Sequence, residues 1–267
     1  MNRHMPIPIL AVSMLLTLPV ALGAVETGTQ ASEPQPQAHN NHRGPKQLVL
    51  ENGLGAKVTL WKPDLTTQPV TPEHGMFTMP KTGMDNYHAV IAERDWGNLK
   101  ETVIRYEYQF GKPSKRSPSE LAGTVKTDFE IIPDPIPREH YRYHSNETWG
   151  FLLRLHGEPA QNIPVSFESE NGSQMKSVTD ERGYVSFRLP DDFPDIVPGE
   201  RDRRSAGFTI TAETENAGIT YQTMLTADYR VAPEHWQSTQ LGLLVAGIGL
   251  ITGGLIGRVK LQGGKKK

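Results

Sequence analysis

Methionine and histidine gather in one short segment of this chain, at His74, Met76, Met79, Met84 and His88. Thioether and imidazole groups together favour copper, with the thioether selecting Cu(I), and imidazole alone also binds nickel, zinc or Cu(II). The segment therefore predicts a site for a transition-metal ion. The alternative is that the methionines fill gaps beneath a sheet and the histidines are ordinary hydrogen-bonded side chains.

Recognisable enzyme signatures are missing from the sequence. It has no Gly-x-Ser-x-Gly elbow, no glycine-rich phosphate loop and no His-Glu-x-x-His zinc motif. Cysteine is absent, which excludes both a thiol nucleophile and disulfides. The formal net charge of −2, with both signs interspersed, provides no basic surface for nucleic acid. We expect a binding protein rather than an enzyme, with no cofactor beyond a possible Cu, Ni or Co ion.

Residues 191–195 contain three aspartates, whose carboxylates could hold calcium. The segment lacks a recognised ligand spacing, and the arginines of residues 201–204 follow it, so a solvated loop is the favoured interpretation. We expect Arg138 and Arg142 to reach the carboxylates of this loop.

The elements that position these residues are predicted to be strands. Ile104, Tyr106, Tyr108 and Phe110 alternate with polar residues, which predicts one inward-facing strand face. Further short strands, separated by turn residues, follow between residues 149 and 231, a pattern typical of an antiparallel sandwich. Its predicted core consists of Ile163, Val165, Phe167, Val185, Phe187, Leu189, Phe208 and Ile210.

We therefore predict an all-β protein with two antiparallel immunoglobulin-like sandwich domains. A flexible leader, residues 24–45, precedes the first domain, residues 46–135. The second domain covers residues 136–232, and the proline-rich residues 132–138 mark the junction. In the first half of the chain, the only helical turn is expected at residues 118–122, capped by a serine at 117 or 119.

Segments of this sequence resemble two known groups of proteins. Residues 159–168 (PAQNIPVSFE) and 177–190 (SVTDERGYVSFRLP) resemble the repeating pattern of immunoglobulin-like, or carboxypeptidase-regulatory-like, sandwich modules. Residues 79–88, 138–140 and 192–194 resemble a bacterial exported family of unknown function. Some members of that family accompany nickel or cobalt uptake systems, which implies a metal-related accessory role.

The chain begins with a predicted signal peptide, residues 1–23. A basic start at Arg3, an apolar middle and a small-residue exit predict cleavage after Gly23, the alternative being an uncleaved anchor.

Near the C-terminus, residues 241–257 carry no charge and are followed by Arg258, Lys260 and a lysine run. This predicts a membrane helix over residues 238–261 and a basic cytoplasmic tail over residues 262–267. A buried core helix is the alternative, and the many Gly and Thr residues disfavour it.

Gly249, Gly253 and Gly257 form a stripe at four-residue spacing along the predicted membrane helix. Such a stripe lets a partner helix approach closely, either a transporter subunit or a second copy, although glycine is also common in membrane helices generally. The expected protein is therefore a single-pass inner-membrane protein with its bulk in the periplasm. It would assist nickel, cobalt or copper uptake or handling; the alternative is a structural interaction module of the envelope without a ligand.

Overall fold

The computed structural model describes residues 47–49, 55–73, 76–137 and 142–235. Within these ranges the protein consists mainly of β-strands, which confirms the predicted all-β class. The first elements are β1 (Gln47–Val49), β2 (Lys57–Trp61), β3 (Thr67–Val70), β4 (Met76–Thr78), β5 (Met84–Asp95), β6 (Leu99–Gln109), β7 (Lys112–Pro113), α1 (Pro118–Gly123) and β8 (Phe129–Pro133). The remaining elements are β9 (Tyr143–His144), β10 (Thr148–Leu155), β11 (Glu158–Pro159), β12 (Pro164–Ser169), β13 (Gln174–Val178), β14 (Tyr184–Arg188), β15 (Ser205–Asn216), β16 (Ile219–Arg230) and η1 (Pro233–His235).

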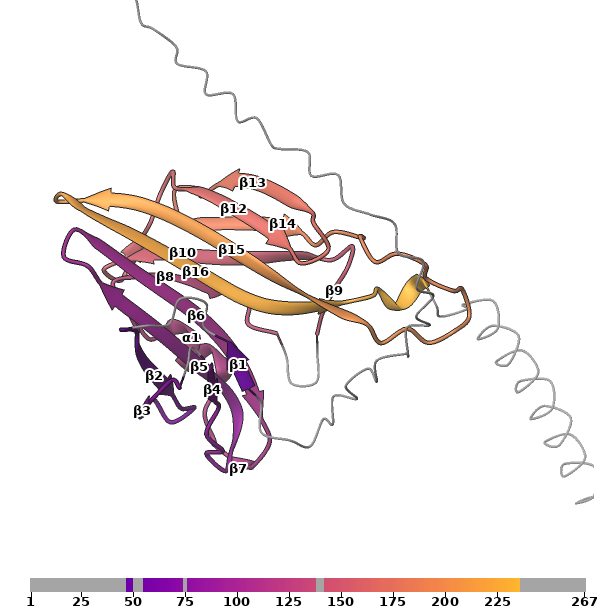
Figure 1. Ribbon diagram of the computed structural model, residues 1–267, viewed down its shortest axis with the longest axis horizontal. Coiled ribbons are helices and arrows are strands. Elements are labelled where there is room, and N and C mark those ends of the chain that lie inside the picture. Colours follow the sequence, from indigo (N-terminus) through magenta and orange to yellow (C-terminus); the bar gives the residue numbers. More distant parts are fainter. Residues whose placement is uncertain (1–46, 50–54, 74–75, 138–141, 236–267) are drawn as a thin grey trace, which may run out of the picture. The chain divides into compact units, whose positions relative to one another are not determined.

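The larger sheet has ten strands in the described part of the chain. Their order is β13-β12-β15-β16-β6-β5-β2-β3, with β7 beside β5 and β9 beside β16. The pairs along this order are antiparallel except β16 and β6, which run parallel from Thr220↔Leu99 to Leu225↔Ile104. Figure 1 shows β6 beside β16, at the place where the first half of the chain joins the second.

The smaller sheet is built around β10, which pairs with β8, β11 and β14. Phe151 and Phe187 from this sheet pack against Phe167 and Phe208 from the larger one. The ring centroids lie 5.6 Å apart for Phe167 and Phe187 and 6.4 Å apart for Phe151 and Phe208. These contacts make the two sheets the layers of a β-sandwich with an aromatic core.

The core predicted from alternation is confirmed in this sandwich. All but one of its eight predicted residues are buried, and Ile163 is partly buried against them. Two-residue periodicity places every second side chain on the inward face, so the strand pattern alone identifies these residues.

Strand pairing crosses the boundary predicted between residues 135 and 136. β8 precedes that boundary yet pairs with β10, and β6 pairs with β16, so both sheets contain strands from both halves. Pro133, in the proline-rich segment, is the last residue of β8. A strand end tolerates proline, and alternation reports which face is buried but not which strand is the neighbour.

β5 is covered on both of its faces. Residues 86–92 are all buried, without the alternation of a strand that has one face in solvent. Tyr87, Ala89 and Ile91 pack in the main core. Val90 and Ala92 face a second cluster, which also contains Val58, Leu60, Phe77 and Met79.

One residue of the predicted inward face of β6 lies elsewhere. Ile104 is buried and Tyr106 and Tyr108 pack against the core, but Phe110 is 67% exposed. The reason is that β6 ends at Gln109, so Phe110 follows the strand rather than continuing its alternation.

The predicted helical turn is present as α1. Ser117 is its N-cap, and Glu120 completes a capping box by accepting a hydrogen bond from the Ser117 backbone N–H.

Candidate functional site

Of the two histidines in the predicted metal segment, His88 lies within the described residues, in the middle of β5. Its side chain is fully buried. Nδ1 lies 3.0 Å from the carbonyl oxygen of Asn86, and because a carbonyl only accepts, Nδ1 carries the ring proton. Nε2 therefore accepts a hydrogen bond from the Thr82 hydroxyl, whose oxygen is 2.7 Å away. Burial lowers the pKa of His88, in spite of an opposing effect of the Asn86 carbonyl, so the ring is neutral.

The predicted methionine ligands have different surroundings. Met79 is buried in the second cluster, which Val90 also faces. His88 is two residues before Val90 on β5, so its side chain points to the same side of the sheet. Met84 is half-buried at the start of β5, where its backbone N–H donates to the Thr82 hydroxyl. The side chain of Met76 and the whole of His74 lie outside the described residues.

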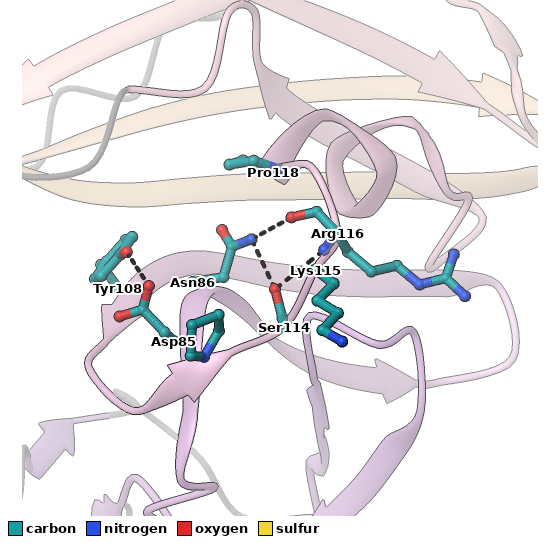
Figure 2. A pocket seen from close by; sticks show the side chains of 8 residues that line it. Asp85, Asn86, Tyr108, Ser114, Lys115, Arg116 and Pro118 are labelled. Carbon is teal, nitrogen blue, oxygen red and sulfur yellow. Dashed lines mark hydrogen bonds between the residues drawn. The ribbon is translucent and has the colours of Figure 1, made fainter.

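A pocket of about 200 Å³ opens beside the same strand. Its lining residues are Asp85, Asn86, Tyr108, Pro113, Ser114, Lys115, Arg116 and Pro118. Figure 2 shows Asp85 and Tyr108 at one end, while the Lys115 and Arg116 side chains extend at the other. The pocket therefore offers a carboxylate and a phenol at one end and two cations at the other.

Backbone packing fixes the floor of this pocket. The Lys112 N–H donates to the Gly83 carbonyl oxygen at 2.8 Å, and β7 then pairs in parallel with β5. Gly111 permits this crossing, because a Cβ at that position would lie 2.2 Å from the Gly83 carbonyl oxygen. The pairing of β7 with β5 brings the loop after β7 against β5, although the two segments are distant in sequence.

Asn86 holds that loop in place. Its side-chain amide donates to the Ser114 hydroxyl at 3.2 Å and to the Arg116 carbonyl oxygen at 2.8 Å, as Figure 2 shows. Its backbone has a φ of 138°, a conformation rare outside glycine. The amide is therefore a structural support, and Asp85 and the two cations carry the pocket's charge.

Asp85 accepts a hydrogen bond from the Tyr108 hydroxyl at 2.9 Å. Arg116 is ion-paired with Glu120 at 2.8 Å, with both side chains nearly half exposed. Such exposed pairs exchange partners at little cost. This arrangement suits a polar segment with separated opposite charges.

A second charged cluster lies under α1, where the side chains of Lys126 and Glu130 are fully buried. The Glu130 carboxylate pairs with Lys126 at 3.2 Å and with Arg154 at 2.8 Å. Arg154 also donates to the carbonyl oxygens of Ala122 and Gly123, and Lys126 donates to that of Leu121, all near the C-terminal end of α1. Burial lowers the pKa of Lys126, and Glu130 opposes that effect only in part. The cluster fastens α1 to β8 and β10.

Two of the three aspartates of residues 191–195 bind protein groups. Asp191 accepts from the Ser145 hydroxyl at 3.1 Å and pairs with His235 at 2.8 Å. Asp192 accepts from Tyr229, from Ser169 at 2.7 Å and from Asn171. Burial alone would raise the pKa of Asp192, but these hydrogen bonds outweigh it and lower the pKa. The sequence had favoured a solvated loop, whereas both of these carboxylates bind protein groups.

The remaining predicted sites fall outside the described residues. These are the signal peptide, the membrane helix and the stripe of Gly249, Gly253 and Gly257. Among the residues that the structure does describe, no helix is long and apolar enough to cross a membrane. The same residues contain no group of three or more His, Asp or Glu side chains arranged to hold a metal ion.

No family model matches the chain, and no curated protein is significantly similar to it. The resemblance to exported metal-uptake accessory proteins therefore stays a prediction.

Sequence reasoning missed the pocket. Asp85, Tyr108 and Lys115 lie on separate segments, and only the crossing of β5 and β7 brings them together. The positive pair Lys115 and Arg116 was the one local signal available, and adjacent cations are common on any surface.

Proposed function

We propose that this protein is a membrane-anchored accessory protein of the bacterial envelope that binds a transition-metal ion without catalysing a reaction. In this proposal residues 1–23 are a signal peptide and residues 238–261 a membrane helix, so that the β-sheet body lies in the periplasm. The sandwich of β10, β12, β14, β15 and β16 is its immunoglobulin-like part. The Gly249, Gly253 and Gly257 stripe contacts a transporter helix or a second copy.

The observation that carries the metal proposal is the pair of hydrogen bonds at the two ring nitrogens of His88. Histidines that bind metals usually donate one ring N–H to a carbonyl or carboxylate and use the other nitrogen as the ligand. His88 donates Nδ1–H to Asn86, which leaves the Nε2 lone pair for a hydroxyl now and for a metal ion after Thr82 rotates. Its lowered pKa keeps that lone pair available at neutral pH.

The thioethers of the same predicted segment favour a soft ion. Met79 lies on the side of β5 that His88 faces, and Met84 is four residues before His88 on the same strand. Two thioethers with one imidazole suit Cu(I) better than Ni(II), Co(II) or Zn(II). We therefore place Cu(I) first among the three metals expected from the sequence.

The test is a competition titration of the full chain in mild detergent, with Cu(I) under reducing conditions against a chromogenic chelator. We expect one Cu(I) per chain, and at least about tenfold weaker binding in Met79→Leu/Met84→Leu. Met175→Leu/Met224→Leu is the matched control, since it removes two methionines of other strands with little change in volume. Equal affinity in both double variants, or no Cu(I) binding by the natural chain, would refute the proposal.

A second candidate, a structural interaction module of the envelope without a metal, is favoured by the pocket. Asp85 and the cations Lys115 and Arg116 present opposite charges at its two ends. A photo-crosslinking residue at Ser114 would give a discrete protein adduct in intact cells under this hypothesis. The same residue at Arg182, in the turn before β14, is the control and should give none; equal labelling at both positions would count against the module.

A further inference from the structure

The pocket beside β5 contains two opposite charges that have no counter-charge in the described part of the chain. The Asp85 carboxylate accepts one hydrogen bond, from the uncharged Tyr108 hydroxyl at 2.9 Å. Lys115 lines the same pocket, and its ammonium group has no hydrogen bond or ion pair within the described residues. Each of these two side chains is therefore able to bind a group of opposite charge from outside the chain.

The remaining charge in the lining is already balanced. Arg116 is ion-paired with Glu120 at 2.8 Å, so Asp85 and Lys115 determine the electrostatic character of the pocket. Figure 2 shows Asp85 at one end and the Lys115 side chain at the other. A simple anion would meet the Asp85 carboxylate, and a simple cation would meet the Lys115 ammonium group. The complementary ligand carries both charges on one molecule.

The loop that carries Lys115 is fixed before any ligand binds. The Asn86 side chain donates to Ser114 at 3.2 Å and to the Arg116 carbonyl oxygen at 2.8 Å, on either side of Lys115. Lys115 has a φ of 58° and Asn86 a φ of 138°, and both are rare for residues other than glycine. Such conformations persist where surrounding contacts hold them, and they concentrate at ligand-binding sites. A loop ordered in advance loses less freedom on binding.

The size of the pocket limits the ligand. Its volume is about 200 Å³, and pockets for drug-sized ligands start at about 300 Å³. Pro113, Pro118 and the Tyr108 ring add apolar surface to the lining. The ligand that fits is therefore small, with an ammonium group, a carboxylate and a short apolar body.

We propose that this pocket binds a small zwitterion, either a free amino acid or a short peptide, with its ammonium group at Asp85 and its carboxylate at Lys115. The proposal is independent of the metal site at His88. It shares its pocket with the second candidate function but names a small molecule as the ligand instead of a protein partner.

The test is a titration of the full chain in mild detergent, followed by ligand-detected nuclear magnetic resonance. The probes are alanine, alanyl-alanine, N-acetyl-alanyl-alanine and alanyl-alanine amide. We expect saturable binding of alanine or alanyl-alanine with a Kd of about 1 mM or below, as the size of these molecules allows. The tighter of the two identifies the source as a free amino acid or a peptide.

Acetylation removes the ammonium charge and should weaken binding of the dipeptide at least about tenfold, because it removes a charged hydrogen bond to a half-buried carboxylate. In Asp85→Asn, which keeps an acceptor for Tyr108, acetylation should change the Kd by less than about twofold. A loss caused only by the bulk of the acetyl group would persist in that variant. Asp95→Asn, at the other end of β5, is the matched control and should keep the full loss.

Amidation removes the carboxylate charge and should weaken binding about threefold, because Lys115 is exposed to solvent. This loss should disappear in Lys115→Gln and remain in Lys176→Gln, which removes an exposed lysine of β13. The absence of saturable binding, or an acetylation loss as large in Asp85→Asn as in the natural chain, would overturn the proposal. A discrete protein adduct at Ser114 without dipeptide binding would overturn the small zwitterion alone and leave the second candidate function standing.

Discussion

Replacing Glu130 by glutamine tests the buried charged cluster under α1. The side chains of Glu130 and Lys126 are both 0% exposed, and that of Arg154 is 11% exposed. Glutamine keeps the volume and one acceptor oxygen but removes the negative charge. Lys126 and Arg154 would then be two cations in a desolvated site with no counter-charge.

The expected cost follows from this geometry. Removing one partner from a buried ion pair costs about 3–5 kcal/mol. Arg154 keeps part of its solvent contact and its carbonyl partners at the end of α1, which relieves it in part. We therefore expect the lower end, about 3 kcal/mol. Lys126→Met/Glu130→Gln removes one of the stranded cations as well, so it should cost less than the sum of the two single changes by about 1–2 kcal/mol.

The assay is urea unfolding of the full chain in mild detergent at neutral pH, followed by tryptophan fluorescence. With a denaturant slope of about 3 kcal/mol per molar, the midpoint of Glu130→Gln should fall by about 1 M. Arg182→Gln is the control, because Arg182 pairs with Asp180 at the surface and is 82% exposed. It should cost about 0.5 kcal/mol or less. A Glu130→Gln midpoint no lower than that of Arg182→Gln would refute the reasoning.

Three further outcomes are expected from measurements of the same kind. Between pH 7 and pH 5 the natural chain should lose stability that His88→Gln does not lose, because the unfolded imidazole binds a proton near pH 6.5 while the folded ring, with its lowered pKa, does not. Asp192→Asn should flatten the loss of stability below about pH 4, since the lowered pKa of Asp192 stabilises the folded state only above the unfolded value. Gly183→Ala should cost at least about 2 kcal/mol, because its φ is +73° and a Cβ would lie 2.6 Å from the Leu153 carbonyl oxygen. Gly172→Ala is the control: its φ is also positive but the space around it is open, so it should cost about 1 kcal/mol. Equal losses in the two variants would show that the backbone contact is unimportant.

The sequence predicted the parts of the fold that depend on local pattern. Alternation identified Phe167 and Phe187 as core, and the Ser117 cap with Glu120 identified α1. Each of these features is decided within a few residues, by the two-residue period of a strand or by the first turn of a helix. The same reasoning placed Phe110 inside, because a period gives no sign of where a strand stops.

The local sequence pattern did not predict which strands pair with each other. The parallel pairing of β16 with β6 joins residues more than a hundred positions apart, and nothing in either strand specifies the other. The pocket has the same origin, since Asp85 meets Lys115 only because Gly111 lets β7 cross beside Gly83. The sequence therefore indicated the class of fold and much of its core, while the candidate pocket required the topology.

The two proposed functions make opposite demands on His88. As a core residue it is already satisfied, with one ring nitrogen on the Asn86 carbonyl and the other on the Thr82 hydroxyl. As a metal ligand it must give up Thr82, and Met79 must turn its sulfur away from the second cluster, in which it is 3% exposed. A metal that binds only the folded chain would offset this rearrangement by stabilising that state through mass action. Added Cu(I) should therefore raise the unfolding midpoint if His88 is a ligand. It should lower the midpoint if His88 is only structural, because the exposed methionines and histidines of the unfolded chain would then be the better ligands.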